Sequence, residues 1–234
     1  MAVVEPDATT GAIGPVPRAG VVPVESSAAP AGLERSRLER AAAAAVERAP
    51  AGPDPGRALV CGPSGGGKSR WAEHLAACSG RSVVYLATGP LLAGDADWQQ
   101  RLERHRRRRP LSWSCLEVEG ELAAALADLA AGQLGLVDSL GTWVAAWLES
   151  EDRVWVERSQ ELLATLSRCR AALVLVGEEV GWGVIPATAA GCRFQARLTA
   201  LQLQIAGQCD AHWLVVGGRA LDLRRLGEAV PAEL

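Results

Sequence analysis

Eight consecutive residues in the first third of the chain have the composition of a phosphate-binding loop: Gly62, Pro63, Ser64, Gly65, Gly66, Gly67, Lys68 and Ser69. Glycines allow the backbone to fold around phosphate groups with its N–H groups pointing inward at a helix N-terminus. The Lys68 ammonium would reach the β- and γ-phosphates, and the Ser69 hydroxyl would bind Mg²⁺. Because an apolar run precedes the loop and an amphipathic stretch follows it, the segment predicts a P-loop that binds a nucleoside triphosphate.

Lys68 is also the single lysine in a chain with 24 basic residues, all the others being arginine. Arginine does not replace lysine where a compact ammonium on a flexible stem is needed. Codon usage that favours arginine is an alternative explanation, with one lysine retained by accident. The position of that lysine inside the loop favours the functional interpretation.

Asp138 ends the apolar run 134–137 and is the candidate acid that holds the metal ion through its water shell. The same aspartate could cap a helix expected over 139–149, and the two roles are compatible. Glu178 and Glu179 follow another apolar run and are further candidates, because ligands bind beyond the carboxyl ends of strands in open α/β sheets. The sequence thus predicts Ser69 and Asp138 as the metal-binding residues.

His105 lies in a segment with six arginines: Arg101, Arg104, Arg106, Arg107, Arg108 and Arg109. In a helix over 95–107 the Arg101 side chain shares a face with His105. The surrounding positive charge would keep the imidazole neutral and nucleophilic, and would hold a triphosphate for attack. His105 is therefore a candidate for a covalent phosphoryl or nucleotidyl intermediate. A solvated basic helix end and a nucleic-acid patch are the alternatives, and the absence of interleaved aromatic residues weakens the second.

From Arg57 onward, short apolar runs alternate with helix-like stretches, which is the pattern of a mainly parallel α/β sheet. Strands are expected at 57–61, 82–87, 134–138, 171–177 and 212–217. Helices are expected near 67–79, 95–107, 119–131, 139–149, 152–169 and 187–207. We therefore predict an α/β domain over residues 57–234, with a doubly wound, mainly parallel sheet of the P-loop NTPase type.

Residues 1–56 differ from the rest in being rich in Ala, Pro, Gly, Val and Ser. This composition predicts a low-complexity N-terminal extension, disordered in its first part, with one helix at 33–48 and a linker at 49–56.

The composition excludes several classes of protein. The 234 residues carry a net charge of −3, which argues against a general nucleic-acid binder. The sequence contains no apolar stretch of about 18 residues that could span a bilayer. The six cysteines form no C-x-x-C pair, which argues against a zinc site or a disulfide framework. The N-terminus lacks the pattern of a signal peptide, so we expect a cytoplasmic protein.

The chain from about residue 57 to 227 resembles the bifunctional adenosylcobinamide kinase / adenosylcobinamide-phosphate guanylyltransferase family of cobalamin biosynthesis. The similarity rests on a series of motifs, which in order are GKSRWAE, VYLATG, RLERHRRRRP, SWSCLEVE, LVDSLGTWV, VLVGEEVGWGVIP and DAHWLVVGG. The arginine-flanked histidine and EVGWGVIP are far more specific than a P-loop alone.

The resemblance implies two reactions. A nucleoside triphosphate, ATP or GTP, phosphorylates adenosylcobinamide, and GTP then transfers GMP through the family's histidine, here His105, to adenosylcobinamide phosphate. The resemblance also implies a homo-oligomer, trimeric in characterised members, and a set of nucleotide contacts. These contacts are Ala87, Thr88, Gly89, Arg106, Arg107, Arg108, Arg109, Glu117 and Asp138. A single-activity P-loop small-molecule kinase and a non-catalytic nucleotide-binding protein are the alternative functions.

Three places depart from the family pattern. The P-loop, GPSGGGKS, lacks an arginine that is usual there, and Glu178 stands where Asn or Ser normally precedes the glutamate. Phe194 is followed by residues that differ from the family's, namely Gln195, Ala196, Thr199, Gln202 and Leu203. The last difference bears on corrinoid affinity or on subunit assembly.

Overall fold

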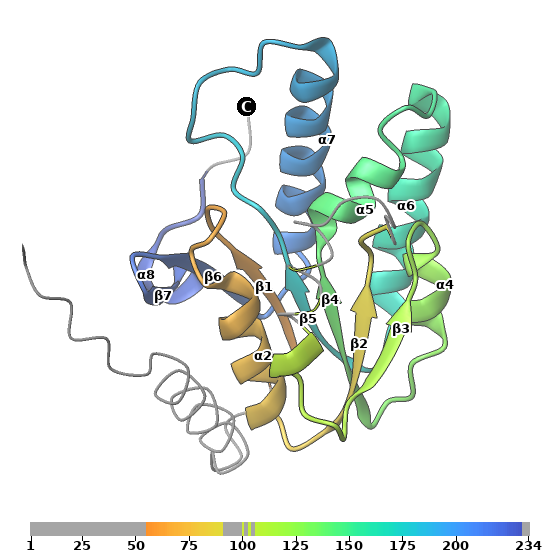
Figure 1. Ribbon diagram of the computed structural model, residues 1–234, viewed down its shortest axis with the longest axis vertical. Coiled ribbons are helices and arrows are strands. Elements are labelled where there is room, and N and C mark those ends of the chain that lie inside the picture. The colour runs from red at the N-terminus through yellow and green to blue at the C-terminus, as the bar shows by residue number, and fades with distance from the viewer. Residues whose placement is uncertain (1–54, 91–99, 101–102, 104–105, 231–234) are drawn as a thin grey trace, which may run out of the picture. The chain divides into compact units, whose positions relative to one another are not determined.

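The computed structural model describes residues 55–90, 100, 103 and 106–230 (Figure 1). Its centre is a seven-stranded sheet in the order β3-β2-β4-β5-β1-β6-β7. The strands are β1 (Arg57–Cys61), β2 (Ser82–Ala87), β3 (Ser114–Glu117), β4 (Gln133–Asp138), β5 (Ala172–Val176), β6 (Ala211–Val216) and β7 (Arg219–Asp222). All neighbours pair in parallel except β7, which runs antiparallel to β6. The prediction of a mainly parallel α/β sheet is confirmed.

The five strands expected from the sequence are all present, within one residue at each end. Strand β1 and its neighbour β5 are apolar and almost wholly buried, as strands covered on both faces must be. The sequence reasoning missed β3 and β7, which lie at the two edges of the sheet. Their residues are partly or wholly exposed, so neither has the continuous apolar run that marks a central strand.

Helices cover both faces of this sheet (Figure 1). They are α2 (Lys68–Cys78), α4 (Leu122–Ala127), α5 (Leu140–Ala146), α6 (Asp152–Arg168), α7 (Ala189–Ala206) and the short α8 (Leu223–Leu226). Helix α2 packs on one face through Ala72 and Ala76. Helices α4, α5, α6 and α7 pack on the other face through most of their leucines and Trp143. Helices on both faces make the sheet doubly wound, as predicted.

Two differences in helix length have local causes. Helix α4 begins at Leu122 rather than near 119, because a turn precedes it in which the Glu121 N–H donates to the Val118 carbonyl at 2.7 Å. Glu119 within that turn has a positive φ of 40°, which an α-helix does not accommodate. Helix α5 is capped by Ser139 and not by Asp138, so the capping role considered for the aspartate is wrong.

Several expectations lie outside the described residues. These are the extension over 1–54 with its helix at 33–48, most of the helix expected at 95–107, and His105 itself. Within the part of the chain that is described, none of the helices has both the length and the apolarity to cross a membrane.

Candidate nucleotide site

The P-loop begins where β1 ends, and two of its glycines, Gly62 and Gly66, lie where an added Cβ would press against backbone atoms. Gly62 has φ of +151°, and a Cβ at this position would collide with the carbonyl group of Val215 in β6. The Gly66 N–H donates to the Pro63 carbonyl at 3.1 Å, which closes the loop. Gly67 adopts a left-handed conformation, φ 102°, immediately before the first residue of α2. The sequence GPSGGG therefore folds into a tight loop at a helix N-terminus, as predicted.

Lys68 is the first residue of α2, and its side chain turns back toward the loop. The residue is 8% exposed, and its Nζ donates to the Pro63 carbonyl at 2.9 Å. An ammonium held this way lies inside the loop that would surround the phosphates. The contact of Lys68 with phosphates stays a prediction.

A cavity of about 300 Å³ opens between the P-loop and the carboxyl ends of the central strands. Seven of the predicted site residues line it: Ser64, Lys68, Ser69, Ala87, Gly89, Arg109 and Asp138. Additional lining residues are Tyr85, Ser139, Gly141, Thr142, Ala145, Val176, Glu178 and Phe194. Because β1, β2, β4 and β5 are parallel, their carboxyl ends meet at one edge, where ligands bind in open α/β sheets.

Asp138 is the last residue of β4 and is held by a residue that the sequence reasoning did not select. The Tyr85 hydroxyl donates to Oδ2 of Asp138 at 2.6 Å. The guanidinium carbon of Arg109 lies 3.3 Å from the centroid of the Tyr85 ring. Burial, with the negative charge of Asp138, raises the pKa of the Tyr85 phenol, so the hydroxyl stays protonated. A signal existed, because a tyrosine in a buried strand needs a partner for its hydroxyl.

Glu178, which follows β5, is a second acid in the cavity. Its Oε1 accepts from the Ser139 hydroxyl at 2.6 Å, and its Oε2 accepts from the Gly141 N–H at 3.0 Å. Its backbone carbonyl accepts from Gln202 Nε2 at 3.0 Å, which ties β5 to α7. Burial raises the pKa of the Glu178 carboxyl, while the Ser139 hydrogen bond and Lys68 oppose this shift. Glu178 thus holds the start of α5 in place beside Asp138.

Thr88, which was predicted to contact the nucleotide, is buried, and its hydroxyl forms hydrogen bonds with backbone groups. Its hydroxyl donates to the Ser139 carbonyl at 2.6 Å and accepts from the Ser139 N–H at 2.8 Å. These bonds connect the ends of β2 and β4, which carry Ala87 and Asp138.

Three of the arginines near His105 are paired with carboxylates and do not line the cavity. Arg106 and Glu117, both predicted to contact nucleotide, form an ion pair at 3.4 Å. Arg107 pairs with Glu103 at 2.9 Å, and Arg108 pairs with Glu73 of α2 at 3.0 Å. Of the described arginines in this segment, Arg109 alone lines the cavity. These ion pairs place Arg106 beside β3 and Arg108 beside α2, the helix that follows the P-loop.

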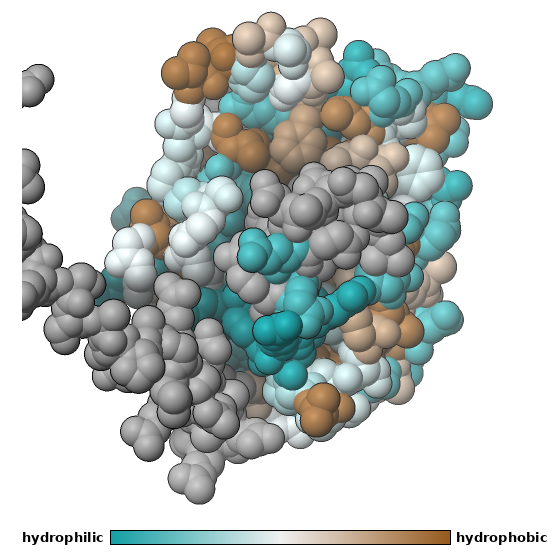
Figure 2. Space-filling view, in the orientation of Figure 1, coloured by the Kyte–Doolittle hydropathy of each residue, from teal (hydrophilic) through white to brown (hydrophobic). Residues whose placement is uncertain are grey.

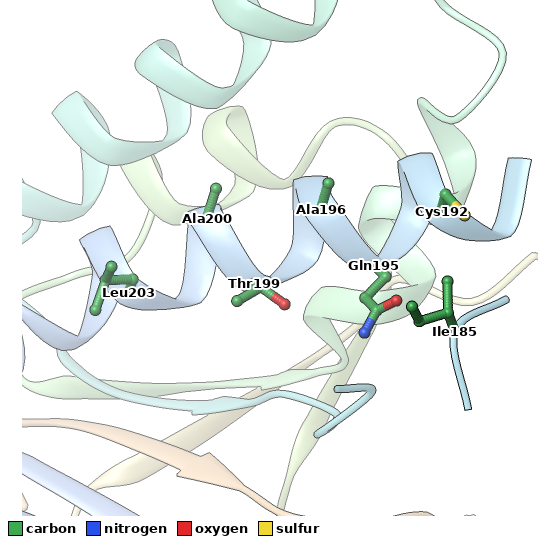
Figure 3. Close-up of a pocket in the computed structure, with 7 residues that line it drawn as sticks. All are labelled: Ile185, Cys192, Gln195, Ala196, Thr199, Ala200 and Leu203. Carbon is green, nitrogen blue, oxygen red and sulfur yellow. The ribbon is translucent and has the colours of Figure 1, made fainter. Parts of the chain in front are cut away.

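A second, shallow groove of about 470 Å³ lies along α7 (Figure 3). Gln195 and Thr199 project from α7 on the side of Ile185 (Figure 3), and the other lining residues are Cys192, Ala196, Ala200 and Leu203. Ile185 and Leu203 are 79% and 75% exposed. Figure 2 shows hydrophobic surface near the end of α7 where the segment from β5 enters it. The groove therefore coincides with the helix that departs from the family pattern.

Comparison with known proteins identifies the family. The model of the family described as cobinamide kinase / cobinamide phosphate guanyltransferase matches residues 58–223, which include every strand of the sheet except the first residue of β1. The chain belongs to this family. Its activities are those of a cobinamide kinase and a cobinamide phosphate guanylyltransferase in adenosylcobalamin biosynthesis, and its nucleotide substrates are therefore nucleoside triphosphates. The match favours this bifunctional enzyme over a single-activity kinase or a non-catalytic binder.

The matches between this chain and its curated relatives cover nearly the whole length of each relative. The bifunctional adenosylcobalamin biosynthesis protein CobP of Pseudomonas aeruginosa is 36% identical over 170 residues, which cover 72% of this chain and 97% of that protein. The protein CobU of Escherichia coli is 30% identical over 181 residues, covering 71% of this chain and 98% of that protein. CobU of Salmonella typhimurium is 32% identical with the same coverage. The matched part of this cobinamide kinase family member therefore corresponds to nearly the whole length of each relative.

Proposed function

We propose that the cavity beside the P-loop binds the nucleoside triphosphate, ATP or GTP, that phosphorylates adenosylcobinamide. In this step the substrate hydroxyl oxygen attacks the γ-phosphorus, the bond to the β,γ-bridging oxygen breaks, and the nucleoside diphosphate leaves. The hydroxyl proton passes to solvent or to a carboxylate. The observation that carries the proposal is that Lys68, Ser69 and Asp138 line one cavity at the helix N-terminus. Lys68 and the loop N–H groups would stabilise the charge on the transferred phosphoryl group.

The same residues are suited to Mg²⁺. The Ser69 hydroxyl and the Asp138 carboxylate are oxygen ligands, which this ion prefers, and both line the cavity. Among the residues that the structure describes, no cluster of three or more His, Cys, Asp or Glu side chains could hold a metal by itself. This fits an ion that is bound by few protein ligands together with the nucleotide. When bound, Mg²⁺ would neutralise charge on the phosphate oxygens.

We further propose that GMP is transferred through His105. The imidazole nitrogen attacks the α-phosphorus of GTP, a P–N bond forms, and pyrophosphate leaves. A phosphate oxygen of adenosylcobinamide phosphate then attacks the same phosphorus, the P–N bond breaks, and the histidine is regenerated. The position of His105 in the family motif supports this role, and Arg109, four residues later, lines the nucleotide cavity.

The covalent step is tested with α-³²P-labelled GTP and the full chain. A phosphorus–nitrogen bond resists alkali and breaks in acid, so protein-bound label that is stable to base and lost in acid is the expected result. The His105→Ala variant should take up no label but should still convert cobinamide to cobinamide phosphate. Label on the variant, or no label on the wild type while GDP-cobinamide is formed, would exclude the histidine intermediate. The Arg153→Ala variant is a matched control, because Arg153 is an exposed arginine of α6 that pairs with Glu157 and was not predicted to contact nucleotide.

The remaining proposals concern assembly and location. We propose a homo-oligomer, a trimer as the family resemblance implies, in which the exposed apolar residues Trp182, Val184, Ile185 and Leu203 are covered. Light scattering should give the mass of a trimer for the wild type and a smaller mass for Leu203→Glu. We also propose a cytoplasmic location, which is consistent with all six cysteines being free thiols.

A further inference from the structure

We propose that Tyr85 is a positioning residue of the nucleotide site, which fixes the Asp138 carboxylate and the Arg109 guanidinium through one side chain. This inference rests on the proposed function of the cavity. It assigns a role to a residue that lies in the motif VYLATG but was not predicted from the sequence to be a site residue. It also connects the two proposed reactions of the bifunctional enzyme. Asp138 is the proposed Mg²⁺ ligand of the kinase step, and Arg109 follows His105, the proposed site of GMP attachment, by four residues.

The first contact is to the carboxylate. Tyr85 lies in β2, two residues before Ala87, which is the register partner of Asp138 in β4. Its side chain is therefore on the same face of the sheet as that of Asp138, and it reaches along the strand to the carboxyl edge. The 2.6 Å hydrogen bond to Oδ2 restricts rotation of the carboxylate. A metal ligand held in this way is already oriented before the ion binds.

The second contact is to the guanidinium. The carbon at its centre lies 3.3 Å from the ring centroid, a cation–π geometry. Arg109 Nη1 donates to Cys115 Sγ at 3.2 Å, and the buried Nε has no hydrogen-bond partner among the described residues. The Tyr85 ring therefore supplies the support for this part of the arginine. A guanidinium fixed on an aromatic face retains donors for phosphate oxygens.

A purely structural role would be satisfied by any side chain of the same shape. Tyr85 is 1% exposed and packs in the core with its strand neighbours, so its ring contributes to stability in any case. The hydroxyl is different, because its hydrogen bond goes to a residue of the cavity. The inference is therefore tested by removing the hydroxyl and keeping the ring.

The decisive variant is Tyr85→Phe, measured in the kinase reaction as a function of Mg²⁺ concentration. We expect the Mg²⁺ concentration for half-maximal activity to rise about tenfold, since a hydrogen bond to a charged group is lost. Trp143 is a buried aromatic residue on the opposite face of the sheet, and the Trp143→Phe variant should leave this Mg²⁺ concentration unchanged.

Two further variants separate this inference from the proposed function. Asp138→Asn should raise the Mg²⁺ requirement at least as much as Tyr85→Phe, and the two changes together should add little. If the Mg²⁺ requirement rises in Asp138→Asn but stays at the wild-type value in Tyr85→Phe, the positioning role is overturned and the proposed nucleotide site still stands. Unchanged activity in both Asp138→Asn and Lys68→Ala would overturn the nucleotide site itself, and the positioning role with it.

The wild-type chain offers a readout that does not depend on the variant folding. Tyr85 is its one tyrosine, so incorporation of 3-fluorotyrosine labels this position alone. The single ¹⁹F resonance should shift when a non-hydrolysable GTP analogue and Mg²⁺ are added. In Asp138→Asn the Mg²⁺-dependent part of the shift should disappear. A resonance that is insensitive to both ligands would overturn the inference.

Discussion

Gly141→Ala should destabilise the protein, although the same change in most helices stabilises them. Gly141 is the second residue of α5, where alanine is intrinsically better than glycine by up to about 1 kcal/mol. A Cβ added to Gly141, however, would collide with Oε2 of Glu178 and would lie 2.8 Å from its Cδ. The carboxylate cannot move without breaking the bonds it accepts from the Ser139 hydroxyl and the Gly141 N–H.

The magnitude follows from three contributions. Loss of one hydrogen bond to a charged group costs about 2 kcal/mol. Displacement of packed atoms adds roughly 1 kcal/mol, and the better helix propensity of alanine returns up to about 1 kcal/mol. The net change in the free energy of unfolding is therefore a loss of about 2 kcal/mol. For a domain of this size it corresponds to a melting temperature lower by about 4–8 °C.

Urea denaturation of four chains measures this effect: the wild type, Gly141→Ala, Glu178→Ala and the double variant. In the Glu178→Ala background the collision is absent, so Gly141→Ala should be neutral or slightly stabilising. The coupling free energy between the two positions should be about 2 kcal/mol. The exposed Gly132 has no atom near the position of an added Cβ, so Gly132→Ala is the control and should change stability by less than about 0.5 kcal/mol. A more stable Gly141→Ala, or additive changes, would refute the described placement of Glu178.

Three further predictions concern other parts of the molecule. Lys68→Arg should lower kinase activity by about a hundredfold in a steady-state assay without changing the melting temperature, because a guanidinium does not replace the ammonium inside the loop. Burial lowers the pKa of His212 below its usual 6.5, so the unfolded chain binds more protons and stability is lost as the pH falls below that value. Between about pH 7 and pH 5, His212→Gln should lose less stability than the wild type, and an equal loss would contradict the argument. Arg197→Met should lower the free energy of unfolding, measured by urea denaturation, by about 2–4 kcal/mol. The reason is that this arginine, 6% exposed, donates to three backbone carbonyls after α5. A loss below about 0.5 kcal/mol would show that these hydrogen bonds contribute little to stability.

The sequence was sufficient for the central sheet because its strands are apolar and buried on both faces. Strand β7 was missed although a signal for it was present. Gly217 and Gly218, with φ of 57° and 72°, form a two-residue turn that pairs Val216 with Arg219. Strand β3 has no comparable signal, since all four of its residues are exposed and it is defined by pairing with β2. Edge strands of this kind depend on tertiary contacts that a single sequence does not contain.

The P-loop residues could be predicted because their chemistry is local, whereas the rest of the cavity is assembled by the sheet. Tyr85 and Asp138 are far apart in the sequence and meet only through the register of β2 with β4. Glu178 was recognised as a candidate from its place after an apolar run. Its bonds to Ser139 and Gly141 could not be foreseen, because they depend on the order of β4 and β5 in the sheet.

The placement of the cavity at the ends of β1, β4 and β5 has a consequence for local opening of the chain. These strands have hydrogen-bonded neighbours on both sides, while β3 and β7 have a neighbour on one side only. Amide hydrogens of β1, β4 and β5 should therefore exchange with deuterium only when the whole domain unfolds, and those of β3 and β7 should exchange through fraying. Occupancy of the cavity would then slow exchange in the inner strands in proportion to ligand affinity, so that exchange rates at β1, β4 and β5 become a direct measure of nucleotide binding.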